Sequence, residues 1–297
     1  MDGWPRFQQS RVPSCAARAP EMQTGIGRSY RDASWLERAT SGSARRAPAW
    51  LRRPLKGVYA MLLRALPGDH LISRLPGGEA FRVDPQFRHL AWNAEEYAAF
   101  KSCVHEGATV MDIGANVGAY TLLFAAWAGP SGRVFAFEPS IASRAGLERH
   151  LHLNGLSDRV VVHGEAVADR IGTVPFRDTG TDGDNRVLPA ARDGARDVRS
   201  ISVDEFCSTH GLVPDVIKID VEGAELSVLR GARRTIAARG SNLSLFLELH
   251  PSLWPGLGYG RVDLEGELAA QRLTIEALPG IAEPWAVEGV CVRVRPL

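Results

Sequence analysis

Charged side chains that could exchange protons lie at the ends of two apolar segments of the chain. Lys218 and Asp220 alternate at the end of one segment, and Glu222 follows two residues later. Glu248 and His250 alternate in the same way at the end of another segment. Ligands of open α/β sheets gather beyond the carboxyl ends of the strands, where a histidine or a carboxylate can remove a hydroxyl proton. We therefore predict Asp220, Glu222 and His250 as candidate catalytic bases.

Structural roles are an alternative for part of this set. Glu222 and Glu225 surround the start of a predicted helix, where an acid stabilises the helix dipole by about 0.3–1 kcal/mol. This role explains Glu225 well. It explains Asp220 poorly, because a charge at the end of an apolar strand needs a partner, for which Lys218 is one candidate. His250 could instead be a core histidine whose ring bonds a backbone carbonyl.

A metal site is a further alternative at these two strand ends. Asp220, Glu222, Glu248 and His250 are all possible ligands, but they lack the dense spacing of a motif such as HExxH. We therefore predict that the site holds no metal.

A glycine loop follows the apolar segment 108–113. Asp112 lies near the end of that segment, the loop itself contains Gly114, Asn116 and Gly118, and a helix is predicted to begin near residue 117. Glycines allow a ligand to approach the backbone closely, and the N–H groups of the helix favour a carboxylate or a phosphate. The spacing is GxxxG with a preceding acid, and not the GxGxxG of dinucleotide-binding loops. It suits the amino-acid half of S-adenosyl-L-methionine, with Asp112 close to the ammonium group.

Two later segments complete the predicted cofactor site. Glu138 ends the next predicted strand, where a carboxylate can accept both hydroxyl protons of a ribose. Glu165 and Ala166 follow the third strand, where Glu165 could accept from the exocyclic amine of adenine and Ala166 could offer its backbone N–H. An exposed loop acid is an almost equally good interpretation of Glu165. Asp220 is also predicted to touch the methionine end of the cofactor.

Apolar segments and amphipathic helices alternate along most of the chain, which predicts an α/β fold with a doubly wound parallel sheet. The predicted strands are residues 108–113, 133–137, 160–163, 216–219 and 243–249, with extra strands at 172–176 and 198–203. The predicted helices are residues 50–66, 95–100, 117–128, 141–153 and 225–239. Residues 274–278 and 289–294 predict an antiparallel C-terminal hairpin. The polar segment 178–196 is predicted to be an exposed loop.

Three motifs together resemble the FkbM family of S-adenosylmethionine-dependent methyltransferases. They are the loop that begins at Met111, the Phe137-Glu-Pro segment, and Lys218-Ile-Asp-Val-Glu-Gly-Ala-Glu, which is the most specific of the three. The resemblance covers residues 95–250. It implies a Rossmann-like, seven-stranded methyltransferase sheet and methyl transfer to a hydroxyl oxygen. The implied acceptor is a small-molecule, glycan or lipid-like compound, which the resemblance does not identify further.

Composition limits the possible partners and compartments. The 297 residues carry a net charge of +1, so the chain lacks the general positive field that would hold a nucleic acid. An uninterrupted apolar run of about 18 residues is absent, which argues against a membrane-spanning helix. The start of the chain lacks the apolar run of a signal peptide, so a cytoplasmic location and free thiols at the four cysteines are expected. The oligomeric state stays open.

The chain divides into three predicted regions. Residues 1–49 read as a basic and disordered leader, residues 50–107 as a cap of helices and strands, and residues 108–297 as the methyltransferase domain. Residues 1–56 carry eleven basic and four acidic side chains, and residues 1–47 show no sustained helix or strand period.

Two other classes of function compete with methyl transfer. An NAD-dependent oxidoreductase would use the same type of sheet, but the GxxxG spacing counts against it. A catalytically silent nucleotide-binding module is the other alternative, and the intact set of Asp112, Gly114, Gly118, Glu138 and Asp220 counts against that.

Overall fold

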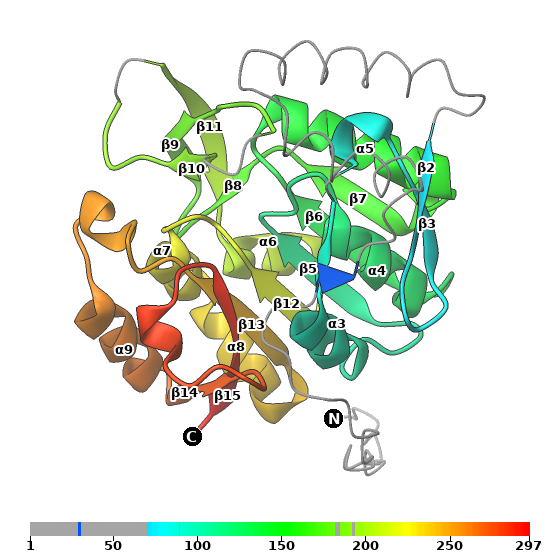
Figure 1. Cartoon of the computed structure of the whole chain (residues 1–297). Coiled ribbons are helices and arrows are strands. Elements are labelled where there is room, and N and C mark those ends of the chain that lie inside the picture. The colour runs from blue at the N-terminus through cyan, green and yellow to red at the C-terminus, as the bar shows by residue number, and fades with distance from the viewer. Residues whose placement is uncertain (1–28, 31–69, 89, 182–184, 192–193) are drawn as a thin grey trace, which may run out of the picture.

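A seven-stranded sheet forms the centre of the computed structural model in Figure 1, which describes residues 29–30, 70–88, 90–181, 185–191 and 194–297. The strand order is β14-β15-β13-β12-β5-β6-β7. Strands β13, β12, β5, β6 and β7 run parallel to one another, and β15 is antiparallel to both of its neighbours. The predicted α/β class and the antiparallel C-terminal hairpin are confirmed. The strands are β5 Thr109–Ile113, β6 Arg133–Phe137, β7 Val160–His163, β12 Val216–Ile219, β13 Ser244–Leu249, β14 Leu273–Ala277 and β15 Val290–Pro296.

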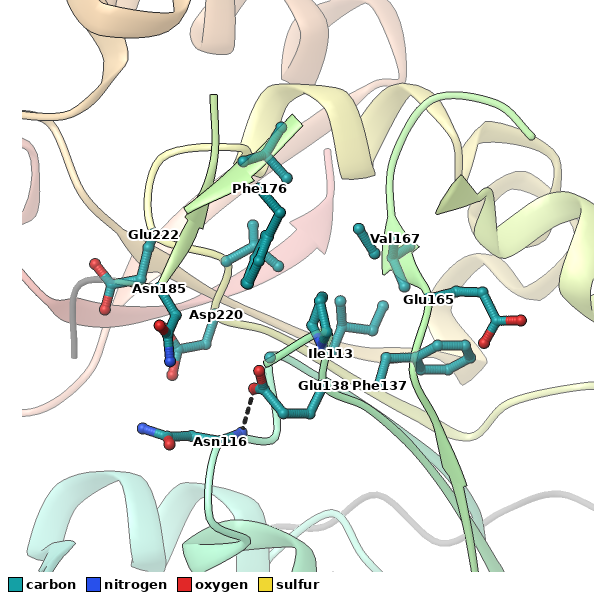
Figure 2. A pocket seen from close by; sticks show the side chains of 15 residues that line it. Ile113, Asn116, Phe137, Glu138, Glu165, Val167, Phe176, Asn185, Asp220 and Glu222 are labelled. Atoms are coloured by element: carbon teal, nitrogen blue, oxygen red, sulfur yellow. Dashed lines mark hydrogen bonds between the residues drawn. The ribbon is translucent and has the colours of Figure 1, made fainter. Parts of the chain in front are cut away.

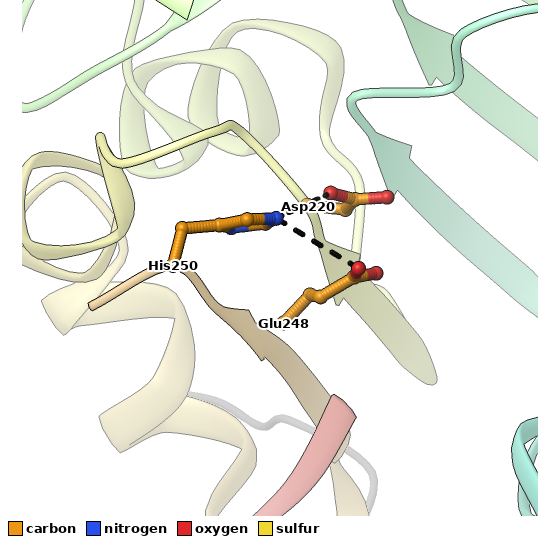
Figure 3. A group of neighbouring side chains, drawn as sticks. All are labelled: Asp220, Glu248 and His250. Carbon is orange, nitrogen blue, oxygen red and sulfur yellow. Dashed lines mark ion pairs between the residues drawn. The ribbon is translucent and has the colours of Figure 1, made fainter. Parts of the chain in front are cut away.

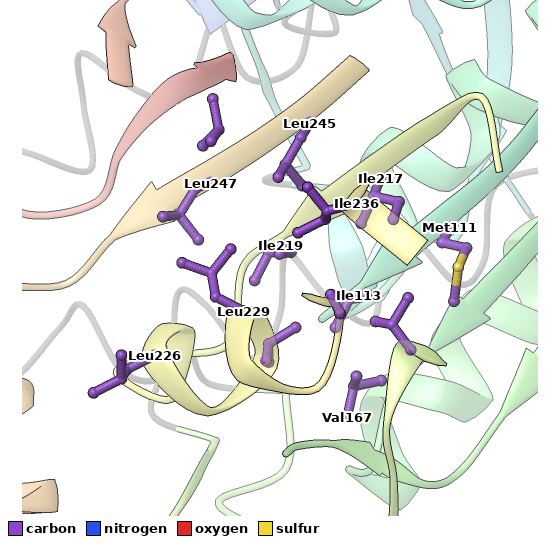
Figure 4. Close-up of a cluster of buried hydrophobic side chains, with 14 of the residues drawn as sticks. Met111, Ile113, Val167, Ile217, Ile219, Leu226, Leu229, Ile236, Leu245 and Leu247 are labelled. Atoms are coloured by element: carbon purple, nitrogen blue, oxygen red, sulfur yellow. The ribbon is translucent and has the colours of Figure 1, made fainter. Parts of the chain in front are cut away.

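Helices cover both faces of this sheet (Figure 1). Alternate residues of one strand join different cores, so Met111 and Ile113 pack in one cluster and Val110 in the other. Figure 4 shows the first cluster, which fills the space between the sheet and the helices after β11 and β12. The helices are α3 Ala94–Lys101, α4 Ala119–Ala128, α5 Ile141–Asn154, α6 Val203–His210, α7 Glu225–Arg230, α8 Arg233–Arg239 and α9 Arg261–Ala270.

The predicted single helix over residues 225–239 is wrong, because the structure divides it into α7 and α8. Gly231 lies at the break, and a side chain there would overlap the carbonyl oxygen of Ala168. The carboxylate of Asp204, at the start of α6, accepts the backbone N–H groups of Arg234 at 2.9 Å and Thr235 at 2.7 Å. A side chain from another helix therefore caps α8, and such a long-range cap leaves no signal in the local periodicity.

A second sheet of four strands, in the order β10-β9-β11-β8, follows β7. Both extra strands predicted in this region are confirmed. Part of the polar segment 178–196, however, is not an exposed loop, because it returns as β10 beside β9 and carries Asn185 and Val187 to a pocket. The strands are β8 Ala166–Val167, β9 Gly172–Arg177, β10 Arg186–Val187 and β11 Ala195–Ile201.

The N-terminal part that the structure describes packs against the main domain. Strands β2 Leu71–Arg74 and β3 Ala80–Val83 form a hairpin, and β1 Ser29–Tyr30 pairs with β4 Trp92–Asn93. The predicted helix at residues 50–66 and nearly all of the predicted leader lie outside the described residues. Among the described cysteines, Cys103, Cys207 and Cys291 are free, as predicted.

Candidate functional site

The glycine loop after β5 packs directly against the end of β12. Gly114 has φ +83°, and a Cβ there would overlap the carbonyl oxygen of Asp220. Gly118 has φ +90°, and a Cβ there would lie 2.5 Å from Cδ1 of Leu147. The sequence-based reason for these glycines, close approach of a ligand, is therefore incomplete, because contacts within the protein already require them.

A matched pair of glycine variants tests this requirement. Gly155 also has a positive φ, +64°, but its Cβ position is open, so Gly155→Ala should lower the free energy of unfolding by about 1 kcal/mol. Gly114→Ala should cost at least about 1 kcal/mol more, because the backbone at Asp220 must move. Urea denaturation measures both changes, and equal costs would contradict the packing role of Gly114.

Glu138 is held by one backbone N–H of the glycine loop and by another from the segment that follows β6. It is 5% exposed, and its carboxylate accepts the N–H of Asn116 at 2.8 Å and that of Ser140 at 2.7 Å. Each oxygen thus accepts one backbone bond and keeps further lone-pair capacity for a ligand. Burial raises the pKa of Glu138 to about 7, against the lowering effect of these two N–H groups.

A pocket opens beside Glu138 at the carboxyl ends of β5, β6 and β12. The space between its walls is about 610 Å³, open space at its mouth included. Figure 2 shows Phe176 of β9 across the pocket from Asn116, and Asn185, which directly precedes β10, also lines the pocket. The pocket collects these predicted residues: Gly114, Asn116, Glu138, Glu165, Ala166, Asp220 and Glu222.

Three further pocket residues escaped the sequence analysis. Phe176, Asn185 and Val187 come from β9 and from the segment that returns as β10. The predicted strand at 172–176 indicated that Phe176 is part of a sheet, but its pattern does not reveal which other segment the strand approaches.

Asn116 and Glu222 also have a strained backbone, with φ of +46° and +50°. Strained residues of this kind cluster at functional sites.

Asp112 lies beneath the pocket, and it is not one of the residues that line it. Its side chain is 1% exposed, and its Oδ2 accepts a hydrogen bond from Thr121 of α4 at 2.5 Å. Burial raises the pKa of Asp112, and the nearby Lys218 opposes that rise. The predicted contact between Asp112 and the ammonium group of a ligand therefore stays a prediction.

Lys218 is a buried cation among acids. It is 2% exposed, and its Nζ donates to Oδ2 of Asp220 at 2.9 Å. Burial by itself would lower the pKa of Lys218, but Asp220, Asp112 and Glu248 together raise it above its usual range. The partner that the sequence suggested for Asp220 is confirmed.

Glu225 is the centre of a buried network, which makes the capping interpretation of this residue insufficient. It is fully buried, and its Oε1 pairs with Nδ1 of His250 at 2.8 Å. Its Oε2 accepts from Nε1 of Trp254 at 2.8 Å and from the hydroxyl of Tyr259 at 3.0 Å. The backbone N–H of Gly223 donates to Oε1 at 3.0 Å, which is the one contact resembling a helix cap.

His250 is 4% exposed, and its ring partner is a carboxylate and not the backbone carbonyl of an ordinary core histidine. Its Nε2 lies 3.5 Å from Glu222, 3.8 Å from Glu248 and 3.9 Å from Asp220. Figure 3 shows the ring edge directed between Asp220 and Glu248. Burial lowers the pKa of His250, but Glu225 and the other acids outweigh it and raise the pKa to about 9. Strands β12 and β13 thus bring the predicted bases together.

The comparison with protein families decides what kind of protein this is. Residues 112–260 match the family model described as "Methyltransferase FkbM domain", which amounts to half of the chain. The chain belongs to the FkbM methyltransferase family. The resemblance inferred from the three sequence motifs is confirmed, and the family segment contains every residue of the pocket and of the His250 network named above.

One curated protein and two solved structures are similar to this FkbM chain. The 2-O-methyltransferase NoeI of Sinorhizobium fredii is 28% identical over 145 residues, which cover 43% of this chain and 58% of that protein. A methyltransferase FkbM from Methylobacillus flagellatus has 22% identity and a TM-score of 0.43, with 63% of this chain and 43% of that chain covered. Fibrillarin from Aeropyrum pernix, solved with bound S-adenosyl-L-methionine, has 14% identity and a TM-score of 0.41, with 78% and 86% covered.

The match spans 58% of the length of the curated relative, so the relative's activity does not pass to this FkbM chain directly. Both TM-scores lie below 0.5, and the family assignment therefore depends on the family model alone. In the described part of the chain, none of the helices combines the length and the apolar composition that crossing a membrane requires.

Proposed function

We propose that this FkbM protein transfers a methyl group from S-adenosyl-L-methionine to a hydroxyl oxygen of a small-molecule, glycan or lipid-like acceptor. The observation that carries the proposal is the pocket beside Glu138, which borders the Asp220–Glu222 strand end. A cofactor site and a set of proton acceptors therefore meet at one edge of the sheet. The 2-O-methyltransferase relative supports oxygen as the atom that is methylated.

The residues of the pocket fit the proposed cofactor. Glu138 offers lone pairs from a carboxylate that two backbone N–H groups already hold in place, as a ribose diol requires. Glu165 and Ala166 lie at the end of the pocket formed by β7 and β8, where an adenine would bind. Asp220 lies at the other end, against the glycine loop. When bound, the cofactor supplies an electrophilic methyl group on a sulfonium.

The protein's own contribution would be alignment and removal of a proton. A bound acceptor must place its hydroxyl in line with the methyl group, and such positioning supplies several kcal/mol. Asp220, Glu222 and His250 lie at the pocket edge, with Nε2 of His250 within 3.9 Å of both carboxylates. Either carboxylate can take the hydroxyl proton directly, and His250 can do so in its neutral form, which its pKa of about 9 favours only at high pH.

The alternatives have less support from the site. An NAD-dependent oxidoreductase would need a loop that cradles a pyrophosphate, whereas here Gly114 packs on Asp220 and the spacing is GxxxG. A silent binding module would have no need for the buried network that orients His250 toward the pocket edge.

A label-transfer experiment tests the proposal. The purified chain is incubated with S-adenosyl-L-methionine carrying a labelled methyl group and with separate glycan and lipid extracts. We expect an acceptor fraction to gain label in a bond that survives mild alkali, as a methyl ether does and a methyl ester does not. Absence of labelled product from every extract, with the cofactor bound, would favour the silent module.

The pH dependence of cofactor binding provides a further prediction. The pKa of Glu138 is about 7 in the free protein, and hydroxyl donors bind its ionised form. Affinity for S-adenosylhomocysteine should therefore be constant above about pH 8 and fall by up to about tenfold per unit below about pH 6. Calorimetry across this range measures the profile. Glu138→Gln should remove this dependence, and an unchanged profile in that variant would refute the assignment.

A further inference from the structure

The ligand atoms of Asp220, Glu248 and His250 surround one point. Each side chain offers one ligand atom, a carboxylate oxygen or an imidazole nitrogen, and these three atoms all lie within 4.8 Å of one another. Nε2 of His250 is 3.8 Å from Oε1 of Glu248 and 3.9 Å from Oδ1 of Asp220. These separations are too long for hydrogen bonds. They are close to the distance of about 3.4 Å or more between two ligands that each lie about 2.1 Å from a shared cation.

His250 is oriented as a metal-binding histidine would be. Its Nδ1 pairs with the buried carboxylate of Glu225 at 2.8 Å, which fixes the ring and leaves Nε2 pointing at the acids. Carboxylates commonly hold the far nitrogen of a metal-ligating imidazole in this way. The side chain is 95% buried, and Nε2 faces the carboxylates of Glu222, Glu248 and Asp220 at 3.5–3.9 Å. The buried ring therefore directs this nitrogen into the cluster of acids.

The carboxylates of Asp220 and Glu248 are also positioned around Nε2 of His250. Oδ2 of Asp220 accepts from Lys218 at 2.9 Å, and Oδ1 lies on the side of His250, 3.9 Å from Nε2. Glu248 approaches from β13 with its Oε1, and Glu222 lies on another side of Nε2 at 3.5 Å. Three carboxylates thus face one imidazole, while Lys218 pairs with only one of them. A divalent cation would balance the excess negative charge.

We propose that Asp220, Glu248 and His250 bind a divalent cation at the edge of the pocket. One imidazole nitrogen with two carboxylate oxygens favours Mn²⁺ or Zn²⁺ over Mg²⁺ or Ca²⁺, which prefer all-oxygen sites. The sequence analysis predicted no metal because these ligands come from the ends of β12 and β13 and form no compact motif. This role rests on the proposed function: the cation would polarise the acceptor hydroxyl and lower the pKa of that hydroxyl.

The test is titration of the full chain, stripped with a chelator, with MnCl₂ alone. Calorimetry and the loss of the free-Mn²⁺ paramagnetic resonance signal should both report one site. Glu248→Gln keeps the side-chain shape and should weaken Mn²⁺ binding at least tenfold, as should His250→Gln. Glu205→Gln changes an acid on α6 that is 44% exposed, and it should leave the affinity unchanged. Thermal melts of all variants show whether the fold is retained.

Two results would overturn the cation site: absence of Mn²⁺ binding at millimolar concentration, or equal binding by wild type and a folded Glu248→Gln. In either case His250 is a protonated imidazolium that balances the acids itself. The titration contains no methyl donor, so its outcome is separate from that of the label-transfer experiment. Mn²⁺ binding without any methyl transfer would support the site and count against the proposed function.

Discussion

Glu225→Ala is expected to lower the free energy of unfolding by about 3–5 kcal/mol, because it removes a charged group from a buried and fully paired network. Glu225 is 0% exposed and accepts from Trp254, Tyr259 and Gly223 while it pairs with His250. Truncation to alanine leaves Trp254, Gly223 and Nδ1 of His250 without this acceptor in a region closed to water, and each unsatisfied donor costs free energy. The hydroxyl of Tyr259 keeps the carbonyl oxygen of Gly223 at 2.6 Å. Urea denaturation followed by circular dichroism measures the loss.

Glu205→Ala is the matched control for this variant. Both glutamates lie in the first turn of a helix, but the side chain of Glu205 is 44% exposed and its ion pair with Arg234 is long, at 4.0 Å. An exposed first-turn acid contributes about 0.3–1 kcal/mol through the helix dipole. If Glu225→Ala costs no more than Glu205→Ala, helix capping is its whole role, and the buried network does not stabilise the fold.

His250→Ala is expected to reduce methyl transfer by about 10²–10⁴-fold, the range for loss of a group that removes the acceptor proton. The affinity for S-adenosylhomocysteine should stay within about twofold, because His250 does not line the pocket that contains Glu138. The rate is measured with the acceptor found by label transfer. The same loss is expected if His250 acts through a cation, since the acceptor hydroxyl would no longer be polarised.

His105→Ala is the control for the histidine variant, because His105 is exposed and bonds only the carbonyl oxygen of Glu106. It should leave the rate unchanged. A folded His250→Ala protein that retains most of its activity would exclude His250 from the chemistry, and Asp220 or Glu222 would remain as the candidate base. A variant that loses cofactor affinity as much as rate would instead place His250 in the cofactor site.

The main sheet was predictable from the sequence because its strands are buried on both faces. Segments such as 133–137 and 216–219 are almost wholly apolar, and the structure reproduces both boundaries as β6 and β12. Glu138 and Asp220 follow those strands directly, so their place at the carboxyl edge of the sheet followed from the strand direction. The sequence also placed Asp220 and His250 on neighbouring strands, and the β12–β13 pairing confirms this.

The parts that escaped prediction depend on contacts between distant residues. Asp204 caps α8 across about thirty residues of sequence, which local periodicity does not reveal. Glu225 meets Trp254 and Tyr259 only after β13 and the following turn have folded back over α7. The buried side chain of Asp112 accepts a hydrogen bond from Thr121, which belongs to helix α4 and not to the strand of Asp112. Local motifs identify such residues but do not fix the direction in which their side chains point.

The most direct test of the central claim, that the pocket beside Glu138 binds the methyl donor, is parallel calorimetric titration with S-adenosylhomocysteine and with NAD⁺. We predict one site for S-adenosylhomocysteine and no measurable heat from NAD⁺. Glu138→Ala should weaken S-adenosylhomocysteine binding at least tenfold, which corresponds to about 1.4 kcal/mol. Binding of NAD⁺ in preference, or S-adenosylhomocysteine affinity that a folded Glu138→Ala protein retains in full, would contradict the account.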